Sequence, residues 1–406
     1  MIERYKLPNG LGVILELDKN SYSAAASVWV KAGSMLESKE ENGLSHFMEH
    51  MAFKGTFTRD AKQLAKQMDA LGGQVNAATD RTSTMYYARV LPDEIDPCLE
   101  LLADIVLNSA LDDESFQKEK RVIAEEIAMV EDSPEENIFD LINKALYEGS
   151  LSETILGEKE TLLNCEKHRL KAFRKKYYVA NNALVIVAGN FNKEKVKAKI
   201  EQCFSSWDKG CEAVYPKNKF LLEPKKIYVK KEMEQAHICL GFRGVAEGDK
   251  KIYAMSMLST ILGGGLSSRL FQSIREEHAL AYQVYSSYTT YPHIGDFIVY
   301  AACKPENLEK VENEIYEQIE KLKAKGIKHE ELDYAKIQVK TSAVTASESL
   351  MYRMHDLGEQ EINLKRYISL SETLSKIDAV TEYDVQKVSE LLRMPCAKAL
   401  IGPAEK

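Results

Sequence analysis

Residues 43–55 read Gly-Leu-Ser-His-Phe-Met-Glu-His-Met-Ala-Phe-Lys-Gly, and this stretch decides how the rest of the chain is interpreted. His46 and His50 are four residues apart, so a helix places both imidazoles on one face, one turn apart. Two imidazoles at this spacing can hold a zinc ion, and the carboxylate of Glu49 beside them can act on a water molecule at the metal. The stretch therefore predicts a metal-binding helix.

The same helix has a second, apolar face. At about 100° per residue, the side chains that fall largely opposite the histidines are Leu44, Phe47, Met48, Met51 and Ala52. We expect this face to pack on the core, with Ser45 or Asn42 capping the start of the helix and Gly55 ending it. The alternative is an ordinary amphipathic helix whose polar residues face solvent.

A third metal ligand is available on a long helix that the sequence predicts from Asp112 to Asp132. The apolar stripe of this helix runs through Phe116, Val122, Ile123 and Val130. Glu119 and Glu126 lie on the same stripe, two turns apart. Because a carboxylate on a buried face is costly unless it meets a cation or hydrogen-bond donors, the pair indicates a compensating positive charge, which a zinc site supplies.

Two alternatives concern the carboxylates of this helix. Glu125 competes for the ligand position, but it points roughly a third of a turn away from the stripe, which favours Glu126. The other alternative is that both glutamates lie on a solvated face and pair with neighbouring cations, namely Lys118, Lys120 or Arg121.

The combined pattern resembles the family of pitrilysin, insulin-degrading enzyme and mitochondrial processing peptidase. Its His-x-x-Glu-His motif reverses the His-Glu-x-x-His order of other zinc proteases and is the inverzincin signature. Seventy-five residues lie between His50 and Glu126, and the family has a ligand Glu at about this distance. The string Val-Ile-Ala-Glu-Glu at residues 122–126 matches the family's Val-x-x-x-Glu, which places the ligand at Glu126.

This resemblance implies a role for each residue of the site. His46, His50 and Glu126 are expected to bind one Zn²⁺ per chain and to leave one position open for water. Glu49 is expected to act as the general base. The family also keeps a Glu two turns before the ligand that supports the site, which corresponds to Glu119 here.

Composition sets the broad class of the protein. A chain of 406 residues is too long for one ordinary core and suits two or more domains. The net charge of -8 argues against a nucleic-acid partner, and no apolar run is long enough to span a membrane. The N-terminal residues lack the apolar core of a secretory signal, and the seven scattered cysteines suit a reducing compartment, so we expect a cytoplasmic location.

The order of expected strands and helices in the first half recurs in the second, which predicts an internal repeat. Residues 1–208 are expected to form a catalytic zinc-binding domain, residues 209–225 a linker, and residues 226–406 a repeat domain without metal. Each domain is expected to be α+β, and the resemblance implies two similar domains, each a mostly antiparallel sheet packed with long helices, that form half of a clamshell.

The resemblance also implies residues that contact the substrate. Family members carry an Arg and a Tyr seven residues apart in the second domain, which correspond to Arg275 and Tyr282; a Tyr hydroxyl can stabilise an oxyanion. The alternative is that Arg275 pairs with a neighbouring glutamate and Tyr282 packs in the core. Asn76 and Ala77 resemble a family edge strand that pairs with the substrate backbone, against the alternative of an ordinary strand. Residues 263–265 are three glycines, for which a flexible or close-packed connection is favoured over a phosphate site.

The predicted function is a zinc endopeptidase that hydrolyses peptides or unfolded segments in an enclosed chamber. The resemblance implies that a chain of this length supplies half of that chamber, so a homodimer is expected first and a heterodimer with a related subunit second. The alternative function is a non-catalytic substrate-binding or structural subunit. A third interpretation, a zinc hydrolase of a non-peptide bond, suits an edge strand and an Arg-Tyr pair less well.

Overall fold

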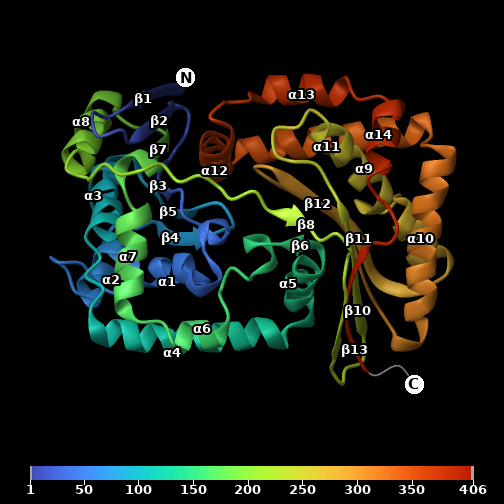
Figure 1. The fold of residues 1–406 in the computed structure, drawn as a ribbon. Helices are drawn as coiled ribbons and strands as arrows, with labels where there is room; N and C mark the ends of the chain where they lie inside the picture. Colours follow the sequence, from blue (N-terminus) through green and yellow to red (C-terminus); the bar gives the residue numbers. More distant parts are fainter. Residues whose placement is uncertain (1, 404–406) are drawn as a thin grey trace. The chain divides into compact units, whose positions relative to one another are not determined.

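The computed structural model describes residues 2–403, which form two compact units. Unit 1 consists of the chain through Ala128, Glu153–Pro216 and Ala346–Tyr367. Unit 2 consists of Met129–Ser152, Lys217–Thr345 and the chain from Ile368 onward. Figure 1 labels the helices and strands of both units.

A six-stranded sheet in the order β1-β2-β7-β3-β5-β4 forms the centre of unit 1. Its strands are β1 (Ile2–Lys6), β2 (Gly12–Leu17), β3 (Ala24–Val30), β4 (Gln74–Thr79), β5 (Thr84–Val90) and β7 (Ala183–Gly189). β2 and β7 pair in parallel, and all other neighbours pair antiparallel. The central strands β3 and β7 are buried along their whole length, which explains their continuous apolar sequences. β4 lies at one edge of the sheet.

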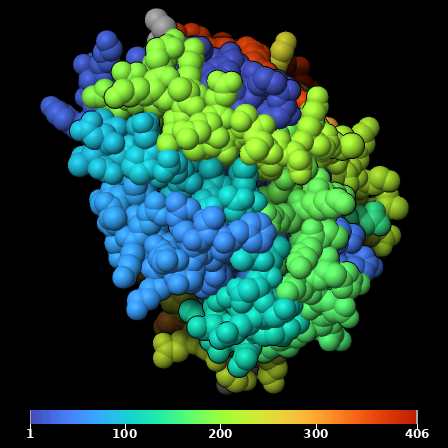
Figure 2. Space-filling view, turned by 90° about the vertical axis from the view of Figure 1, so that its left-hand side faces the viewer, coloured from blue at the N-terminus to red at the C-terminus, as the bar shows by residue number. Residues whose placement is uncertain are grey.

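Helices cover the sheet of unit 1. They are α1 (Leu44–Ala52), α2 (Ala61–Ala70), α3 (Ile95–Leu107), α4 (Asp113–Asp132, through Ala128), α6 (Lys159–Leu163), α7 (Lys167–Tyr177), α8 (Lys193–Phe204) and α12 (Leu350–Glu359), with a π-helical turn at Gln360–Leu364. α1 contacts β4, β5 and α7, while α3 contacts β3, β5 and α8. α4 runs below α1 and α7 in Figure 1, and Figure 2 shows the face on which α2, α3 and α8 reach the surface.

Unit 2 contains a five-stranded sheet in the order β11-β12-β10-β13-β9 and a small sheet of β6 and β8. The strands are β6 (Tyr147–Glu148), β8 (Lys219–Phe220), β9 (Lys226–Lys230), β10 (Ala236–Arg243), β11 (Ala281–Tyr291), β12 (Ile294–Cys303) and β13 (Ala397–Gly402). The helices are α5 (Pro134–Leu146), α9 (Ile252–Gly263), α10 (Leu308–Lys325), α11 (His329–Glu348), α13 (Leu370–Asp378) and α14 (Glu382–Ser389), with a π-helical turn at Phe271–Glu277. α5 contacts β10 and β13, whereas α9 contacts β11.

The two sheets share one topology, which confirms the predicted repeat and the predicted α+β class. Read from the opposite edge, the sheet of unit 2 runs β9-β13-β10-β12-β11, which matches β2-β7-β3-β5-β4 of unit 1 strand for strand. Only β9 and β13 pair in parallel, as do β2 and β7. α4 and α11 are both 20 residues long, and their alignment places Ala335 and Ser342 where unit 1 has Glu119 and Glu126.

The boundaries of the compact units differ from the expected division into 1–208 and 226–406. Met129–Ser152, with α5, belongs to unit 2, and Ala346–Tyr367, with α12, belongs to unit 1. α12 covers one face of the first sheet, where a buried apolar cluster includes Trp29, Leu184, Ile186, Leu350, Met354 and Leu357. Its three members from α12 recur at helical spacing and so lie on one face of that helix.

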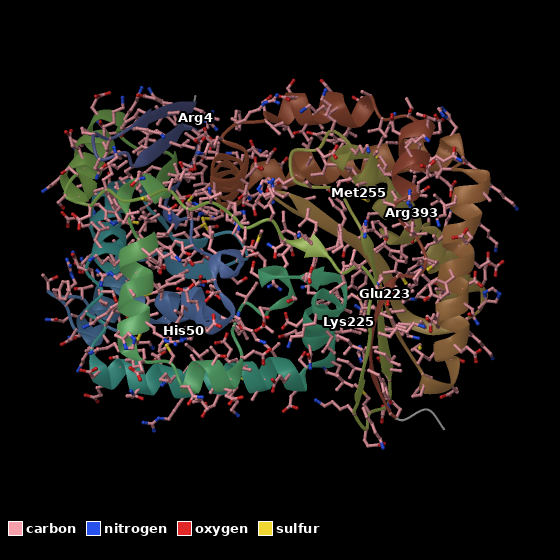
Figure 3. The ribbon with its side chains drawn as sticks, in the orientation of Figure 1. Arg4, His50, Glu223, Lys225, Met255 and Arg393 are labelled. Carbon is pink, nitrogen blue, oxygen red and sulfur yellow. The ribbon has the colours of Figure 1, made fainter. Side chains whose placement is uncertain are left out.

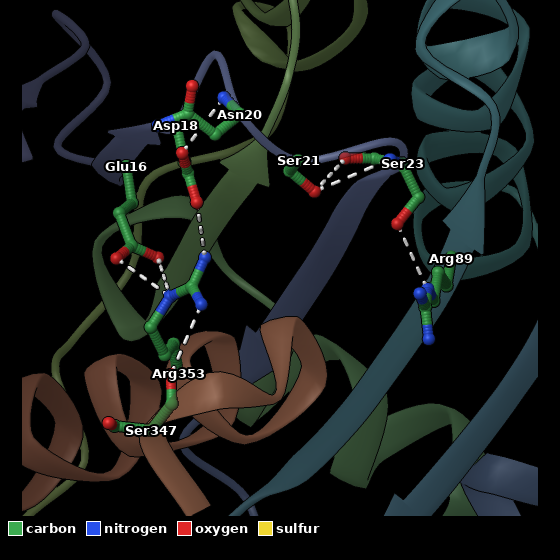
Figure 4. A network of polar contacts seen from close by, with 8 residues as sticks. All are labelled: Glu16, Asp18, Asn20, Ser21, Ser23, Arg89, Ser347 and Arg353. Carbon is green, nitrogen blue, oxygen red and sulfur yellow. Dashed lines mark hydrogen bonds and ion pairs between the residues drawn. The ribbon is translucent and has the colours of Figure 1, made fainter. Parts of the chain in front are cut away.

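Polar contacts also attach α12 to unit 1 (Figure 4). Arg353 Nε lies 3.0 Å from Glu16 Oε1, and a second nitrogen of its guanidinium lies 3.2 Å from Asp18 Oδ2. Gly358 packs so closely on the sheet that a Cβ there would lie 2.2 Å from Trp29 Cε2. Glycine is therefore required at this contact.

The structure also bears on two expectations from composition. No helix within residues 2–403 combines the length and the apolar character that crossing a bilayer requires. All seven cysteines are free thiols, and five of them are buried.

Candidate metal centre and catalytic site

The motif helix α1 places its apolar side chains in the core, as predicted. Leu44, Phe47, Met48, Met51 and Ala52 are all at least 96% buried. The predicted caps were wrong, because α1 begins after Gly43 without a side-chain cap from Ser45 or Asn42, and it ends at Ala52, with Phe53 rather than Gly55 as its C-cap. Gly43 has a φ of 91°, which favours glycine at this turn.

A residue six positions before Gly43 performs the capping. Glu37 Oε2 accepts the backbone N–H of Gly43, and Glu37 Oε1 accepts that of Ser45, both at 2.7 Å. The Glu37 side chain is buried, and burial raises its pKa to about 7 although these hydrogen bonds oppose the shift. A carboxylate at a helix N-terminus satisfies free N–H groups and the helix dipole. Sequence reasoning missed this residue.

His46, His50 and Glu126 come together as predicted, within unit 1. Glu126 Oε2 lies 3.4 Å from His50 Nε2 and 3.8 Å from His46 Nε2. One potential ligand atom from each residue lies within 4.8 Å of the other two, and no other such group of three was found in residues 2–403. The imidazole of His46 is buried, whereas the Glu126 side chain is 41% exposed, so the group is open on one side. Figure 3 labels His50 on α1, above α4.

The neutral imidazole of His46 and the orientation of His50 suit metal binding. Burial, with a contribution from the nearby charge of His50, lowers the pKa of His46 to about 3. Its imidazole is therefore neutral at physiological pH, which is the form that binds a metal. His50 Nδ1 lies 3.1 Å from Glu119 Oε2. A carboxylate on Nδ1 favours the tautomer with its free electron pair on Nε2, toward Glu126. The residues present thus fit a zinc ion.

Glu119 is buried beside His50, and its second oxygen lies 2.9 Å from Lys54 Nζ. Among residues 2–403 its ion-pair partners are thus His50 and Lys54, not the cations of its own helix. Lys120, one of those cations, is itself buried and donates to the backbone carbonyl of Cys165. Sequence reasoning missed Lys54.

The face of α4 differs in detail from the predicted stripe. Phe116, Glu119 and Ile123 are buried, but Val122 is 40% exposed and belongs to the outer face. Glu125 is exposed and lies outside the group of candidate ligands. The structure therefore brings Glu126, and not Glu125, to the two histidines.

Glu49, one residue before His50, has a hydrogen-bond partner that sequence reasoning did not assign. Thr79 Oγ1, at the end of β4, donates to Glu49 Oε2 at 2.5 Å. Burial raises the pKa of the Glu49 carboxyl, whereas Thr79 and His50 oppose this shift and the charge of Glu126 adds to it. Glu49 is thus held by a residue of β4 while it adjoins His50 on α1.

Comparison with known proteins identifies the family. A family model described as Insulinase (Peptidase family M16) matches residues 12–159. A second model, described as Peptidase M16 inactive domain, matches residues 164–339. The chain belongs to peptidase family M16. The two matches agree with the position of the His-x-x-Glu-His motif. The first match contains this motif, and the second, to the inactive domain, does not.

Full-length relatives place this M16 chain among the short bacterial members. It is 39% identical to the uncharacterized zinc protease YmxG of Bacillus subtilis over 100% of this chain and 99% of that protein. It is 36% identical to an uncharacterized zinc protease of Rickettsia felis over 98% and 97% of the two chains. A protease from Helicobacter pylori has a similar structure, with a TM-score of 0.90, 27% identity and 99% coverage of both chains. A structure from Pseudomonas fluorescens titled as a peptidase M16 inactive domain reaches the same TM-score at 20% identity over 100% and 98% of the chains, which shows the fold alone.

The expected peptide-binding strand of this M16 chain is β4, which lies at the edge of its sheet. Asn76 is exposed and Ala77 is buried, and the Asn76 side chain accepts the backbone N–H of Ala77 at 2.9 Å. β4 pairs with β5 on one side only. An edge strand leaves backbone groups available for another strand.

Arg275 and Tyr282 of the M16 chain lie together in unit 2. The Arg275 guanidinium lies 4.9 Å from the centre of the Tyr282 ring and 4.8 Å from that of Phe271, within the distance of cation–π contacts. Arg275 also lies 3.9 Å from Glu276, a long ion pair with both side chains substantially exposed. Tyr282 is 76% exposed and does not pack in the core. The contact of either residue with substrate stays a prediction.

Two of the three glycines at 263–265, Gly263 and Gly264, have a packing role. A Cβ at Gly263 would lie 2.4 Å from the backbone nitrogen of Ser286, and one at Gly264 would lie 2.6 Å from Thr260 Cα. Such distances exclude larger residues, which supports a close-packed connection.

Proposed function

We propose that this M16 chain is a zinc-dependent endopeptidase that hydrolyses peptides or unfolded segments. The observation that carries this proposal is the group of His46, His50 and Glu126, with Glu49 next to His50 on α1 and bonded to Thr79. The names of the relatives, which describe zinc proteases, support the same class of reaction.

In this proposal His46, His50 and Glu126 hold one zinc ion per chain. When bound, zinc polarises the scissile carbonyl and lowers the pKa of a coordinated water. Glu49 accepts the proton of the attacking water and later delivers it to the leaving amine. Glu119 keeps His50 in the required tautomer and orientation through Nδ1.

The same proposal assigns substrate contacts to both units. β4, with Asn76 and Ala77, receives an extended peptide by backbone pairing, which gives little selectivity for side chains. Tyr282 donates a hydrogen bond to the developing oxyanion, and Arg275 binds a carbonyl of the substrate. Exchange of Tyr282 for Phe is then expected to lower kcat more than it raises KM, because an oxyanion forms only during the reaction.

We further propose that the chain acts in the cytoplasm as a homodimer that encloses its substrate, with a heterodimer as the second possibility. The alternative function is a non-catalytic subunit that binds substrate or supports a related peptidase. The complete set of ligands and base disfavours that alternative, because a binding subunit needs none of them.

The deciding experiment is cleavage of a mixed set of unstructured peptides, together with zinc analysis, for the wild type and Glu49→Gln. We expect about one zinc per chain in both proteins, with cleavage by the wild type alone. Glu125→Gln is the matched control, because it removes a neighbouring exposed carboxylate from α4 and should cleave as the wild type does. Zinc in both proteins without cleavage would point to the non-catalytic subunit or a missing partner. Absence of zinc from both would refute the site.

A further inference from the structure

We propose that Thr79 is a positioning residue that fixes the carboxylate of Glu49 for its role as base. This inference rests on the proposed peptidase function. It concerns the hydrogen bond from Thr79 Oγ1 to Glu49 Oε2, which at 2.5 Å has the length of a hydroxyl bound to an ionised carboxylate.

The distances around Thr79 direct its proton to Glu49. A threonine hydroxyl carries one proton. Thr84 Oγ1, across the β4–β5 pair, lies 3.3 Å from Thr79 Oγ1 but donates its own proton to the carbonyl of Ala32 at 2.8 Å. Thr84 could therefore only accept from Thr79, and the Glu49 carboxylate at 2.5 Å is the nearer and the charged acceptor for the single proton of Thr79.

Thr79 lies on the same strand as the residues that are proposed to pair with the substrate. Thr79 is the last residue of β4, directly opposite Thr84 in the sheet. Asn76 and Ala77, which are proposed to pair with the substrate, precede it on the same strand, and α1 packs on this strand. One strand would therefore hold both the substrate backbone and the base, so that the base keeps a fixed distance from the peptide bond bound beside it.

The hydroxyl of Thr79 positions the Glu49 carboxylate and does not bind the metal. Thr79 is not among the candidate ligands His46, His50 and Glu126. Its backbone N–H also favours the ionised carboxylate of Glu49, and a side-chain substitution leaves this group in place. Loss of a hydrogen bond between a hydroxyl and a charged group in the transition state makes a reaction roughly ten- to a hundredfold slower.

The test compares Thr79→Val, which keeps the β-branched shape without the hydroxyl, with Thr79→Ser, which keeps the hydroxyl. Thr79→Val should lower kcat by about ten- to a hundredfold while KM, zinc content and melting temperature stay near the wild-type values. Thr79→Ser should recover most of the rate. Thr58→Val is the matched control. Thr58 also donates a hydrogen bond to a carboxylate, that of Asp104 at 3.4 Å, and neither residue belongs to the proposed site.

A crystal structure of Thr79→Val supplies a second measurement that does not depend on turnover. The Glu49 carboxylate should leave its wild-type position or occupy several. An unchanged kcat, or a Glu49 side chain that stays in place, would overturn the inference. If Thr79→Val does not fold, Thr79→Ala against Thr79→Ser decides in the same way, with equal kcat values counting against the proposal. If the wild type binds zinc but cleaves no peptide, the proposed function fails separately, and the position of Glu49 still tests the role of Thr79.

Discussion

His50 on α1 and Glu119 on α4 are joined across 69 positions of the sequence by a contact of 3.1 Å between Nδ1 and Oε2. The contact links the motif helix to the helix that carries Glu126. It also occupies the ring nitrogen that faces away from the candidate metal position. The two helices are thus fixed relative to each other at the point where both contribute to the site.

Glu119→Gln should weaken zinc binding by about ten- to a hundredfold. The amide keeps the shape of the side chain but loses the charge that orients His50 and pairs with Lys54. Competition with a chelator of known zinc affinity measures the change, with Glu125→Gln as the control on the exposed face of the same helix. Wild-type affinity in Glu119→Gln would contradict the orienting role.

Glu126→Gln should lose zinc under conditions in which Glu125→Gln retains about one ion per chain. The reason is geometric, because only Glu126 reaches the two histidines. Metal analysis after dialysis against a weak chelator measures the outcome. If the two variants behaved in reverse, the third ligand would be Glu125.

Glu37 should make stability depend on pH. Burial raises its pKa in the folded chain to about 7 from an ordinary value of 4.5. Between these values the folded chain keeps a proton that the unfolded chain has released, so the stability contributed by this group falls as the pH rises from about 4.5 to 7. The total change is up to about 3 kcal/mol.

Melting temperatures of the wild type and Glu37→Gln, both freed of metal, measure this effect between pH 5 and 8. Glutamine does not titrate, so the wild type should lose stability relative to the variant as the pH rises. A constant difference across this range would show that Glu37 has an ordinary pKa.

Gly358→Ala should destabilise unit 1 by about 1–3 kcal/mol, because the new methyl group overlaps the indole ring of Trp29. Gly265→Ala is the control, since a Cβ there meets Gln338 no closer than 3.5 Å. Thermal unfolding compares the two variants. Equal melting temperatures would show that α12 can shift on the sheet without cost.

Local patterns in the sequence predicted most of the fold. The periodic face of α1 reports burial directly, and the structure agrees with it. The strand β11 gives no comparable signal, because its burial follows no strict alternation at the edge of the sheet. Strands of this kind lack the period of two that identifies others.

The contacts that support the site were harder to predict because they join residues far apart in the sequence. His46, His50 and Glu126 could be proposed from a motif and a helical face. Lys54 and Thr79 could not, since nothing near them in the sequence indicates the carboxylates that they meet. The position of α12 was equally hard to predict. Its apolar face can be recognised in the sequence, but the sheet that this face covers cannot.

The exchange of segments between the units has a consequence for how the protein is made. The last stretch of unit 1 ends at Tyr367, so 367 of the 406 residues must be synthesised before that unit can be complete. Until then Trp29 and Leu184 lack the helix that covers them. A chain released before α12 is made therefore carries the histidines and all six strands of the sheet, but an apolar face of that sheet stays uncovered, and we expect such a chain to aggregate more readily than the whole chain.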